Sequence, residues 1–546
     1  MAASVDFVFL LFLSLFLSIL SAISASNYQS GTVYITKDKQ AKFVPGKLDK
    51  VNGAAYGIYN DTLSTTGWGV LDIKAGYATA DIDNNLLMYA AGYLEGVLTN
   101  KRIYQHYQNV YNTMVGNISP ELKKKTVDFY AEQEKWAWYM IDKMTPDDPF
   151  WRHVGYVMNQ ESGLYDGYTF ASHNSNMTLD KFAIQFLNGV GDYIDIRHVL
   201  NPAGRPNWRN MTHKDALRMV NSNGHCSALI KVTGAYENIF MSHSSWFLYA
   251  ATMRIYKHYD FNLKDSYTVA KTMSFSSYPG FIESLDDFYL LGSQMVMIQT
   301  TNNMFNNDLY ETVKPTTLLS WQRVRVAHFM ANDGRQWGNY FSMFNSGTYN
   351  NQYMIVDLKK IKLGETIMDG ALYVVEQIPT LVVYRDETKI LREGHWPSYN
   401  VPFFETVYNM SGYPEFVKMH GLDSSYQLAP RAKIFRRDAG AVRDMESMKK
   451  IMRYNDYEND PYSGKNPCNT ICCRADLDPE KPRADGCYDT KVSDYKMALN
   501  RESFAINGPT RGNKLEPFSW TAKFKDSHLG LPHTYDFDFV EMKPIL

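Results

Sequence analysis

Alternating apolar and polar positions predict β-strands through the middle of the chain. The alternation is clearest at 69–82 (GVLDIKAGYATADI), 226–233 (CSALIKVT), 351–361 (NQYMIVDLKKI) and 371–386 (ALYVVEQIPTLVVYRD). A period of two is typical of a strand that buries one face, because successive side chains point to opposite sides of the sheet. These segments therefore predict an extensive β-sheet core.

Helical patterns flank the predicted strands. Residues 119–144 are typical of a helix, with Ser119 as the N-cap and Pro120 at the first helical position. Helices and strands do not alternate regularly along the chain, as they would in a doubly wound parallel sheet. The predicted fold class is therefore α+β, with sheets and helices in layers.

The N-terminus has the pattern of a targeting segment. An apolar run from Phe7 to Leu20 precedes small residues that offer a cleavage site near Ala25 or Ser26. We interpret 1–26 as a signal peptide, with a retained anchor as the alternative. The later run LLMYAAGYLEGVLT contains Glu95 and is too short to span a bilayer. The mature chain is therefore expected outside the cytosol and without a transmembrane segment.

Composition narrows the class of protein. The 546 residues are 45% hydrophobic and include 29 Phe, 39 Tyr and 10 Trp, which is enough for a large core. A formal net charge of −2 excludes the broad basic surface of a general nucleic-acid-binding protein. Secretory passage would also expose the chain to N-glycosylation. N-x-S/T sequons, expected to carry glycans, begin at Asn60, Asn117, Asn176, Asn210 and Asn409.

Four of the five cysteines lie in one short segment, CNTICCRADLDPEKPRADGC, at 468–487. In an oxidising compartment they can form two local disulfides that pin this loop. The favoured pairing is Cys468 with Cys473 and Cys472 with Cys487, because a bond between the adjacent Cys472 and Cys473 would be strained. A zinc knuckle is the rival interpretation, although no histidine lies nearby. Cys226 is left without an obvious partner.

The sequence lacks the familiar catalytic and cofactor motifs. It contains no G-x-S-x-G elbow, no P-loop, no dinucleotide fingerprint and no H-E-x-x-H pattern. We therefore expect neither a cofactor nor a metal ion. The chemistry then depends on Cys226, in the stretch NGHCSALIKVTGAYENIFMSHSSW.

A hairpin around Cys226 would give it a histidine neighbour. If the turn centres on Gly234 and Ala235, Cys226 falls directly opposite His243, within the reach of cross-strand side chains. A turn centred on Glu237 and Asn238 would remove this pairing. Both registers fit the alternation.

A lone cysteine in a strand is usually a core residue, but this position allows a second interpretation. If the peptide bond between His225 and Cys226 were cut, the new α-amine would lie on the same residue as the thiol. That amine has an ordinary pKa near 7.7–8.0 and could accept the thiol proton. One residue would then supply both the nucleophile and its base.

Several segments together resemble the phospholipase B-like proteins. They are 219–246, SYNVPFFE at 398–405, APRAKIFRRD at 429–438 and the late cysteine cluster. That family comprises lysosomal or secreted glycoproteins of the N-terminal nucleophile hydrolase superfamily. The resemblance implies an αββα four-layer sandwich and cleavage between His225 and Cys226. It divides one domain into an N-terminal chain, 27–225, and a C-terminal chain, 226–546.

The resemblance also implies roles for individual residues. Cys226 would be nucleophile and base, and His243 and Trp246 would line the pocket where related hydrolases such as penicillin V acylase carry Arg and Asp. Asn400 would stabilise the oxyanion, and Arg431 would favour thiolate over thiol. Thr300 or Thr301 would complete the pocket wall.

The implied activity is acyl hydrolysis, with removal of fatty acyl chains from glycerophospholipids. Hydrolysis of N-acyl amides is the first alternative, and a non-catalytic glycoprotein that binds lipid or protein is the second. The expected partner is a phospholipid or another acylated small molecule, with peripheral contact to lipid, and a homodimer is left open. The expected location is the lysosome or the outside of the cell.

Overall fold

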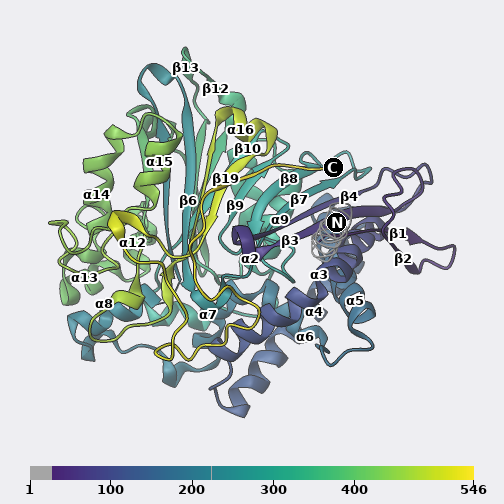
Figure 1. Ribbon diagram of the computed structural model, residues 1–546, viewed down its shortest axis with the longest axis horizontal. Coiled ribbons are helices and arrows are strands. Elements are labelled where there is room, and N and C mark those ends of the chain that lie inside the picture. The colour runs from purple at the N-terminus through teal and green to yellow at the C-terminus, as the bar shows by residue number, and fades with distance from the viewer. Residues whose placement is uncertain (1–27, 223) are drawn as a thin grey trace, which may run out of the picture.

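The computed structural model describes residues 28–222 and 224–546 (Figure 1). The predicted signal peptide, residues 1–26, lies outside the described residues. The chain forms two large β-sheets with helices gathered on either side of them. The predicted α+β class is therefore confirmed.

The larger sheet contains eleven strands within the described residues. Neighbouring strands pair antiparallel except β4 and β7, which are parallel. The order across the sheet is β15 (Leu381–Asp386), β14 (Leu372–Ile378), β11 (Asn351–Asp357), β10 (Met295–Thr301), β9 (Phe288–Leu291), β8 (Thr272–Ser277), β7 (Arg254–Phe261), β4 (Trp68–Ala75), β3 (Ala55–Thr62), β1 (Tyr28–Ile35) and β2 (Ala41–Pro45).

The smaller sheet contains seven strands within the same described residues and carries Cys226. Its order is β16 (His395–Ser398), β5 (His225–Val232), β6 (Ile239–Leu248), β18 (Asp489–Asp494), β19 (Ser503–Asn507) and β20 (Val540–Met542), and β17 (Asp485–Cys487) also pairs with β6. A short separate ribbon joins β12 (Ile361–Lys362) to β13 (Thr366–Ile367).

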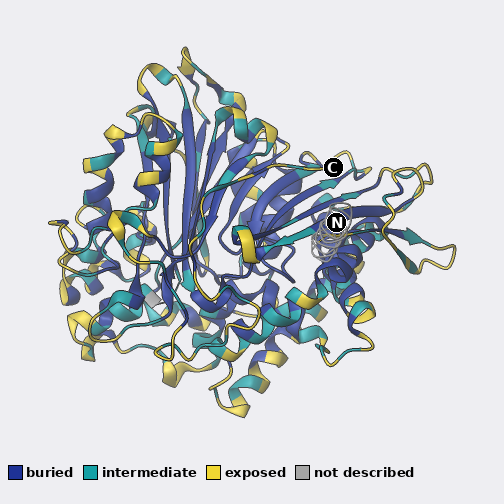
Figure 2. Ribbon diagram, viewed as in Figure 1, coloured by how far each residue is buried: buried dark blue, intermediate teal, exposed yellow. Residues whose placement is uncertain are grey.

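The two sheets pack against each other through alternating residues of their strands. Ala228 and Ile230 of β5 belong to the same buried cluster as Val296 and Ile298 of β10. Met297, which lies between the last two, belongs to the cluster on the opposite face of the larger sheet. Both faces of these central strands are therefore buried, as the colouring in Figure 2 also shows.

Helices cover the outer faces of both sheets. The outer face of the larger sheet packs against α3, α9 and α10, with α5 packed on α3 and α9, and that of the smaller sheet against α8, α13, α14 and α15. The helices are α2 (Leu63–Thr66), α3 (Asn84–Met114), α4 (Pro120–Met144), α5 (Pro149–Ser172), α6 (Lys181–Asn188), α7 (Val190–Leu200), α8 (His213–Ser222), α9 (Ser320–Met330), α10 (Gly334–Ser342), α11 (Thr388–Arg392), α12 (Glu405–Met410), α13 (Tyr413–His420), α14 (Pro430–Asp438), α15 (Met445–Met452) and α16 (Tyr495–Asn500).

The apolar run around Glu95 forms part of α3 and is buried in the protein. A Cβ atom at Gly92 would lie 1.9 Å from the carbonyl oxygen of Gln160 in α5, so a glycine is required where the two helices cross. Glu95 forms a fully buried ion pair with Lys257 of β7, with an Oε1 to Nζ distance of 2.6 Å. No helix among the described residues is both long enough and apolar enough to cross a membrane.

The predicted elements mostly match the structure. The helix predicted at 119–144 is α4, and the Ser119 hydroxyl accepts a hydrogen bond from the Leu122 N–H at 3.2 Å. The segment at 371–386 forms the hairpin β14–β15. The strand predicted at 69–82 ends earlier, at Ala75, because Gly76 adopts a φ of +82° and turns the chain out of the sheet.

The cysteine pairing predicted for the late cluster is confirmed. Disulfides join Cys468 to Cys473 and Cys472 to Cys487. These cysteines form one small buried cluster with Trp246 and Ala475, so the loop is fastened beside β6. Cys226 is buried and unpaired.

Candidate active site

The hairpin that carries Cys226 has a register that differs from both of those considered. Cys226 lies opposite Ser245, and His243 lies opposite Ala228. The pairing of Cys226 with His243, one of the two open alternatives, is therefore wrong, because the turn is longer than two residues. Ala235 and Tyr236 both adopt positive φ, and the last backbone pair before them joins Thr233 to Asn238. The shift is two residues, so His243 keeps to the same face of the sheet as Cys226.

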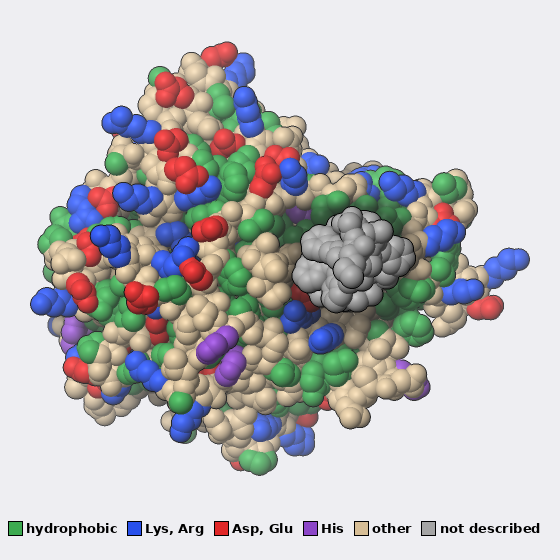
Figure 3. All heavy atoms as spheres, viewed as in Figure 1, with side chains coloured by type: hydrophobic (Ala, Val, Ile, Leu, Met, Phe, Trp, Pro, Cys, Tyr) green, Lys and Arg blue, Asp and Glu red, His purple; other side chains and the backbone are tan. Residues whose placement is uncertain are grey.

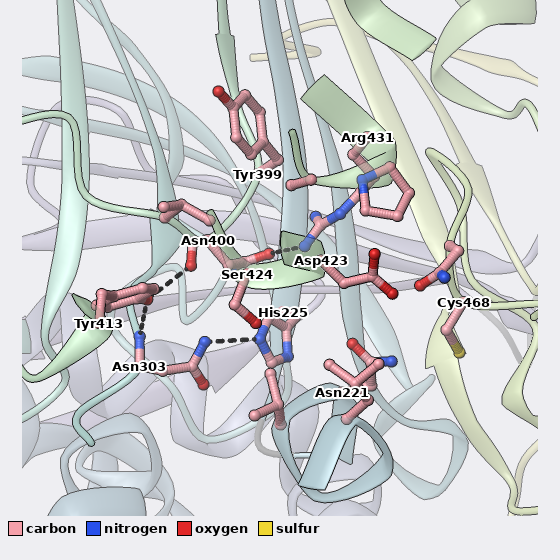
Figure 4. A pocket seen from close by; sticks show the side chains of 16 residues that line it. Asn221, His225, Asn303, Tyr399, Asn400, Tyr413, Asp423, Ser424, Arg431 and Cys468 are labelled. Carbon is pink, nitrogen blue, oxygen red and sulfur yellow. Dashed lines mark hydrogen bonds between the residues drawn. The ribbon is translucent and has the colours of Figure 1, made fainter. Parts of the chain in front are cut away.

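Two polar side chains hold the backbone of Cys226. Its N–H donates to the Asn400 Oδ1 atom at 3.2 Å, and its carbonyl oxygen accepts from the Arg431 guanidinium at 2.6 Å. Arg431 also donates to Asn400 Oδ1 at 2.7 Å, which closes the set of contacts (Figure 4). The structure therefore brings three of the predicted site residues together.

Local structure explains how these two side chains reach Cys226. Asn400 follows β16, which pairs with β5, and adopts a left-handed φ of +67°. Asn tolerates this conformation better than most residues. Arg431 lies in the first turn of α14, directly after Pro430. Its guanidinium lies over the Trp246 ring, with 4.3 Å between the guanidinium carbon and the ring centroid.

The contacts of Asn400 and Arg431 differ from those expected. Asn400 presents its oxygen to Cys226, and its amide nitrogen donates to the Thr301 carbonyl at 2.5 Å. Arg431 contacts the Cys226 carbonyl and the Ser227 hydroxyl, with no hydrogen bond to the thiol among the described residues. Burial lowers the pKa of Arg431 to about 9, although the nearby Cys226 opposes that shift.

The Cys226 thiol faces a small cavity between the sheets. Ser245, Asp286, Thr301 and Tyr349 are among the residues that line this cavity. Burial raises the pKa of the Cys226 thiol to about 12, while the Trp246 N–H and the charge of Lys491 act in the opposite direction. In the uncut chain the residue is therefore a neutral thiol.

Lys491 connects the cavity to a buried network of charges. Its Nζ atom lies 2.7 Å from Ser245 Oγ, 2.7 Å from Asp286 Oδ2, 2.8 Å from Asp489 Oδ1 and 3.2 Å from His243 Nδ1. Burial and the charge of Lys491 hold the pKa of His243 well below its usual range. His243 is therefore a neutral imidazole in this network.

Of this network, only His243 was predicted from the sequence. Arg254 pairs with both carboxylates, at 2.8 Å from Asp286 and 3.0 Å from Asp489. A metal ion could in principle be held here, because possible ligand atoms of His243, Asp286 and Asp489 all lie within 4.8 Å of one another. Two buried cations already balance the two carboxylates, so the arrangement fits an ion-pair network better than a site for a metal ion.

His225 lies on the opposite side of β5 from the thiol. It contacts Asn303, with 3.2 Å between the His225 Nε2 and Asn303 Nδ2 atoms, at a cavity that Asn400 and Arg431 also line (Figure 4). Burial and the nearby Arg431 charge lower the pKa of His225 to about 3. Gly224 precedes it with a φ of +79°, which favours glycine there.

The two threonines considered for the pocket wall lie in different surroundings. Thr301 lines the cavity at the thiol, and its carbonyl holds Asn400. Thr300 is buried between the sheets, where its hydroxyl lies 2.6 Å from that of Ser398. Of the two, Thr301 is therefore the one beside Cys226.

The surface agrees with the composition. Acidic and basic side chains are interspersed on the face drawn in Figure 3. Asn60, at the end of β3, is only partly exposed. The sequons with exposed asparagines are at Asn117, Asn176, Asn210 and Asn409.

Comparisons with known proteins identify the family. The fold and site define an α+β protein built around one buried cysteine in a polar setting. The family model for phospholipase B matches residues 55–542. The chain is 54% identical over 517 residues to phospholipase B-like 1 of Rattus norvegicus, covering 94% of this chain and 92% of that one.

More distant relatives give the same result. Identity is 53% over 517 residues with phospholipase B of Crotalus adamanteus, covering 94% and 93% of the two chains. It is 39% over 502 residues with phospholipase B-like protein D of Dictyostelium discoideum, covering 89% and 86%. The chain belongs to the phospholipase B family, and the expectation of a hydrolase is confirmed at the level of that family.

Proposed function

We propose that this protein hydrolyses acyl esters of glycerophospholipids, with Cys226 as its nucleophile after cleavage of the His225–Cys226 bond. The observation that carries the proposal is the convergence of Asn400 and Arg431 on the backbone of Cys226. Both side chains bind the backbone of Cys226 itself, so a polar acceptor already lies beside the nitrogen that cleavage would turn into the α-amine. The relatives named as phospholipases supply the substrate class.

Cleavage would turn the Cys226 N–H into an α-amine that remains next to Asn400 Oδ1. The amine would take the thiol proton, and the sulfur would attack the acyl carbonyl to form a thioester. The ammonium would protonate the departing alcohol, and water would release the fatty acid. In the uncut chain one Asn400 amide proton points to Thr301, which leaves the second for a developing oxyanion.

The packing of sheets and helices agrees with this proposal. Two sheets in contact, with helices on both outer faces, support the proposal of a four-layer αββα arrangement of the N-terminal nucleophile hydrolase type. In that arrangement 27–225 and 226–546 remain one domain after cleavage. The strands of both segments pair across β4 and β7, so cutting the chain leaves the larger sheet joined.

A secreted or lysosomal location completes the proposal. The two disulfides need an oxidising compartment to form. The four exposed sequon asparagines are available to glycosylation. We propose that the protein acts on lipid surfaces from the aqueous side.

The test compares purified wild-type protein with Cys226→Ala. N-terminal sequencing of the wild type should find a chain that starts at Cys226, and the variant should stay uncut. Both proteins are then assayed at acidic pH against glycerophospholipids and against N-acyl amides. We expect release of fatty acid from the phospholipid by the wild type and a loss of at least about a hundredfold in the variant.

The outcomes are distinct. Hydrolysis of the amide alone would replace the ester substrate with the amide substrate. A wild-type chain that stays uncut and inactive after acidification would contradict the proposal and favour a non-catalytic protein that binds lipid or protein. Phospholipid hydrolysis that survives Cys226→Ala would show that the nucleophile lies elsewhere.

A further inference from the structure

Ser245 occupies a position that the proposed chemistry does not yet explain. It is the direct cross-strand neighbour of Cys226 and lines the same small cavity. The backbone groups of both residues are engaged elsewhere. The Cys226 N–H binds Asn400, and the Ser245 N–H binds Asp489 at 3.0 Å.

This arrangement brings the two side chains close together. A pair whose N–H groups bond elsewhere is a non-hydrogen-bonded pair of the antiparallel ladder, in which opposite Cα atoms approach to about 4.5 Å and the side chains are nearest. The Ser245 hydroxyl and the Cys226 thiol therefore share one face of the sheet at the closest spacing that the ladder provides.

Lys491 determines which hydrogen bonds the Ser245 hydroxyl accepts and donates. An ammonium has three protons, and the three shortest contacts of Nζ are Ser245, Asp286 and Asp489. The Ser245 oxygen thus accepts a hydrogen bond from Lys491, and its own proton remains to be donated. Among the described contacts its only other partner is His243 Nδ1, at the long distance of 3.4 Å.

We propose that Ser245, held by Lys491, is a positioning residue that donates a hydrogen bond to the Cys226 thiolate. The inference rests on the proposed function, because it needs the sulfur to lose its proton. In that step the S–H bond breaks, the proton moves to the α-amine, and the sulfur keeps the electron pair. The Ser245 proton then turns from the neutral His243 towards the anion, which is the stronger acceptor.

The charges around Ser245 support this direction. Lys491 and Asp489 face it from β18, His243 from β6, and Arg254 of β7 and Asp286 complete the network. The two cations balance the two carboxylates before the thiol ionises. A thiolate therefore enters a network whose charges are balanced, where the Ser245 hydroxyl, bound by Lys491, can add a hydrogen bond to that from the Trp246 backbone N–H.

The experiment measures thiol reactivity without substrate. Cleaved protein is treated with iodoacetamide across a pH series, and modification of Cys226 is followed by mass spectrometry. Ser245→Ala should slow alkylation about tenfold at acidic pH and move its midpoint up by about one pH unit, with an unchanged maximum at high pH. The rate of self-cleavage, which uses the same sulfur, should fall in parallel.

Matched variants separate hydrogen bonding from structure. Ser245→Thr and Ser245→Val have the same shape, but only the first retains a hydroxyl. The Thr variant should keep the wild-type profile and the Val variant should behave like Ser245→Ala. Ser244→Ala is the strand control, because its hydroxyl bonds to Met452 and Thr490 and the residue faces the other side.

Equal profiles for the Thr and Val variants would overturn the proposal, as would a wild-type profile in Ser245→Ala. Either result, in a protein that still cleaves itself, would leave the proposed function standing. A wild type that forms no Cys226 amino terminus would instead remove the proposed function itself.

Discussion

Two buried aspartates, Asp286 and Asp192, show opposite ways of placing a carboxyl inside this protein. Asp286 lies 2.8 Å from Arg254 and 2.7 Å from Lys491. Burial alone would raise its pKa, yet these two cations hold the pKa well below the usual range. Asp286, in the charge network behind Cys226, is therefore ionised at every physiological pH.

Asp192 of α7 has neutral partners. It accepts hydrogen bonds from the Ser320 N–H, at 3.0 Å, and from the Thr348 hydroxyl. Burial raises its pKa to about 6, and that of its neighbour Asp195 is also raised to about 6 by burial. The pKa values of these two buried carboxyls therefore differ because Asp286 forms ion pairs with two cations, whereas at Asp192 the charge of Arg323 only partly opposes the effect of burial. Asp286 is therefore expected to stay charged at mildly acidic pH, whereas Asp192 and Asp195 of α7 are expected to take up protons near pH 6.

We expect the largest loss of stability from removing a cation from the charge network around Asp286. Lys491→Met would leave Asp286 and Asp489 with Arg254 as their remaining ion-pair partner. Breaking a buried pair in this way costs about 3–5 kcal/mol. We expect the free energy of unfolding in urea to fall by that amount, at acidic and at neutral pH alike.

The control for Lys491→Met is Lys264→Met, which removes an exposed pair with Asp81. We expect no measurable change there, because exposed pairs contribute little. A Lys491→Met protein as stable as the wild type would mean that the network is not held together by its charges.

The raised pKa values of Asp192 and Asp195 in α7 predict that the free energy of unfolding depends on pH. The folded state binds the Asp192 and Asp195 protons more tightly than the unfolded chain, whose ordinary pKa is 3.8. Their burial therefore costs stability above about pH 6, and the cost is relieved as pH falls from about 7 towards 4. The contribution of these two carboxyls to stability should therefore rise on acidification, opposite in sign to that of a paired carboxylate such as Asp286.

The variant Asp192→Asn tests the direction of this pH dependence. An amide oxygen can accept the same two hydrogen bonds without carrying a charge. The variant should exceed the wild type in unfolding free energy by up to about 3 kcal/mol at neutral pH and match it at acidic pH. The exposed Asp38→Asn serves as the control. A constant difference at both pH values would contradict the assignment of the titration to Asp192.

Local patterns in the sequence were sufficient for elements that local chemistry decides. Ser119 and Pro120 determine where α4 begins, and the spacing of the four late cysteines restricts their pairing. The register of the Cys226 hairpin was not predictable in this way. It depends on two consecutive non-glycine residues, Ala235 and Tyr236, that adopt positive φ in a four-residue loop.

The charge network could not be predicted because its members meet only in the folded chain. Arg254, Asp286 and Lys491 come from three segments that are far apart in sequence. One signal was present in the sequence. Asp489 and Lys491 are two residues apart on a strand, so they share a face. Predicting which face requires the pairing of β18 with β6, which no local pattern contains.

The smallest expected change in stability comes from removing a hydrogen bond to Asp195 of α7. The Tyr310 hydroxyl donates to Asp195 Oδ1 at 3.0 Å and stabilises the charged carboxylate. Tyr310→Phe should therefore cost about 1 kcal/mol at neutral pH and less at acidic pH, where the carboxyl is protonated. The pH dependence of unfolding would become steeper. Tyr353→Phe is the matched control, because its hydroxyl contacts the uncharged Ser320 and Asn351. Equal slopes for the two variants would show that Asp195 does not titrate in the folded protein over this range.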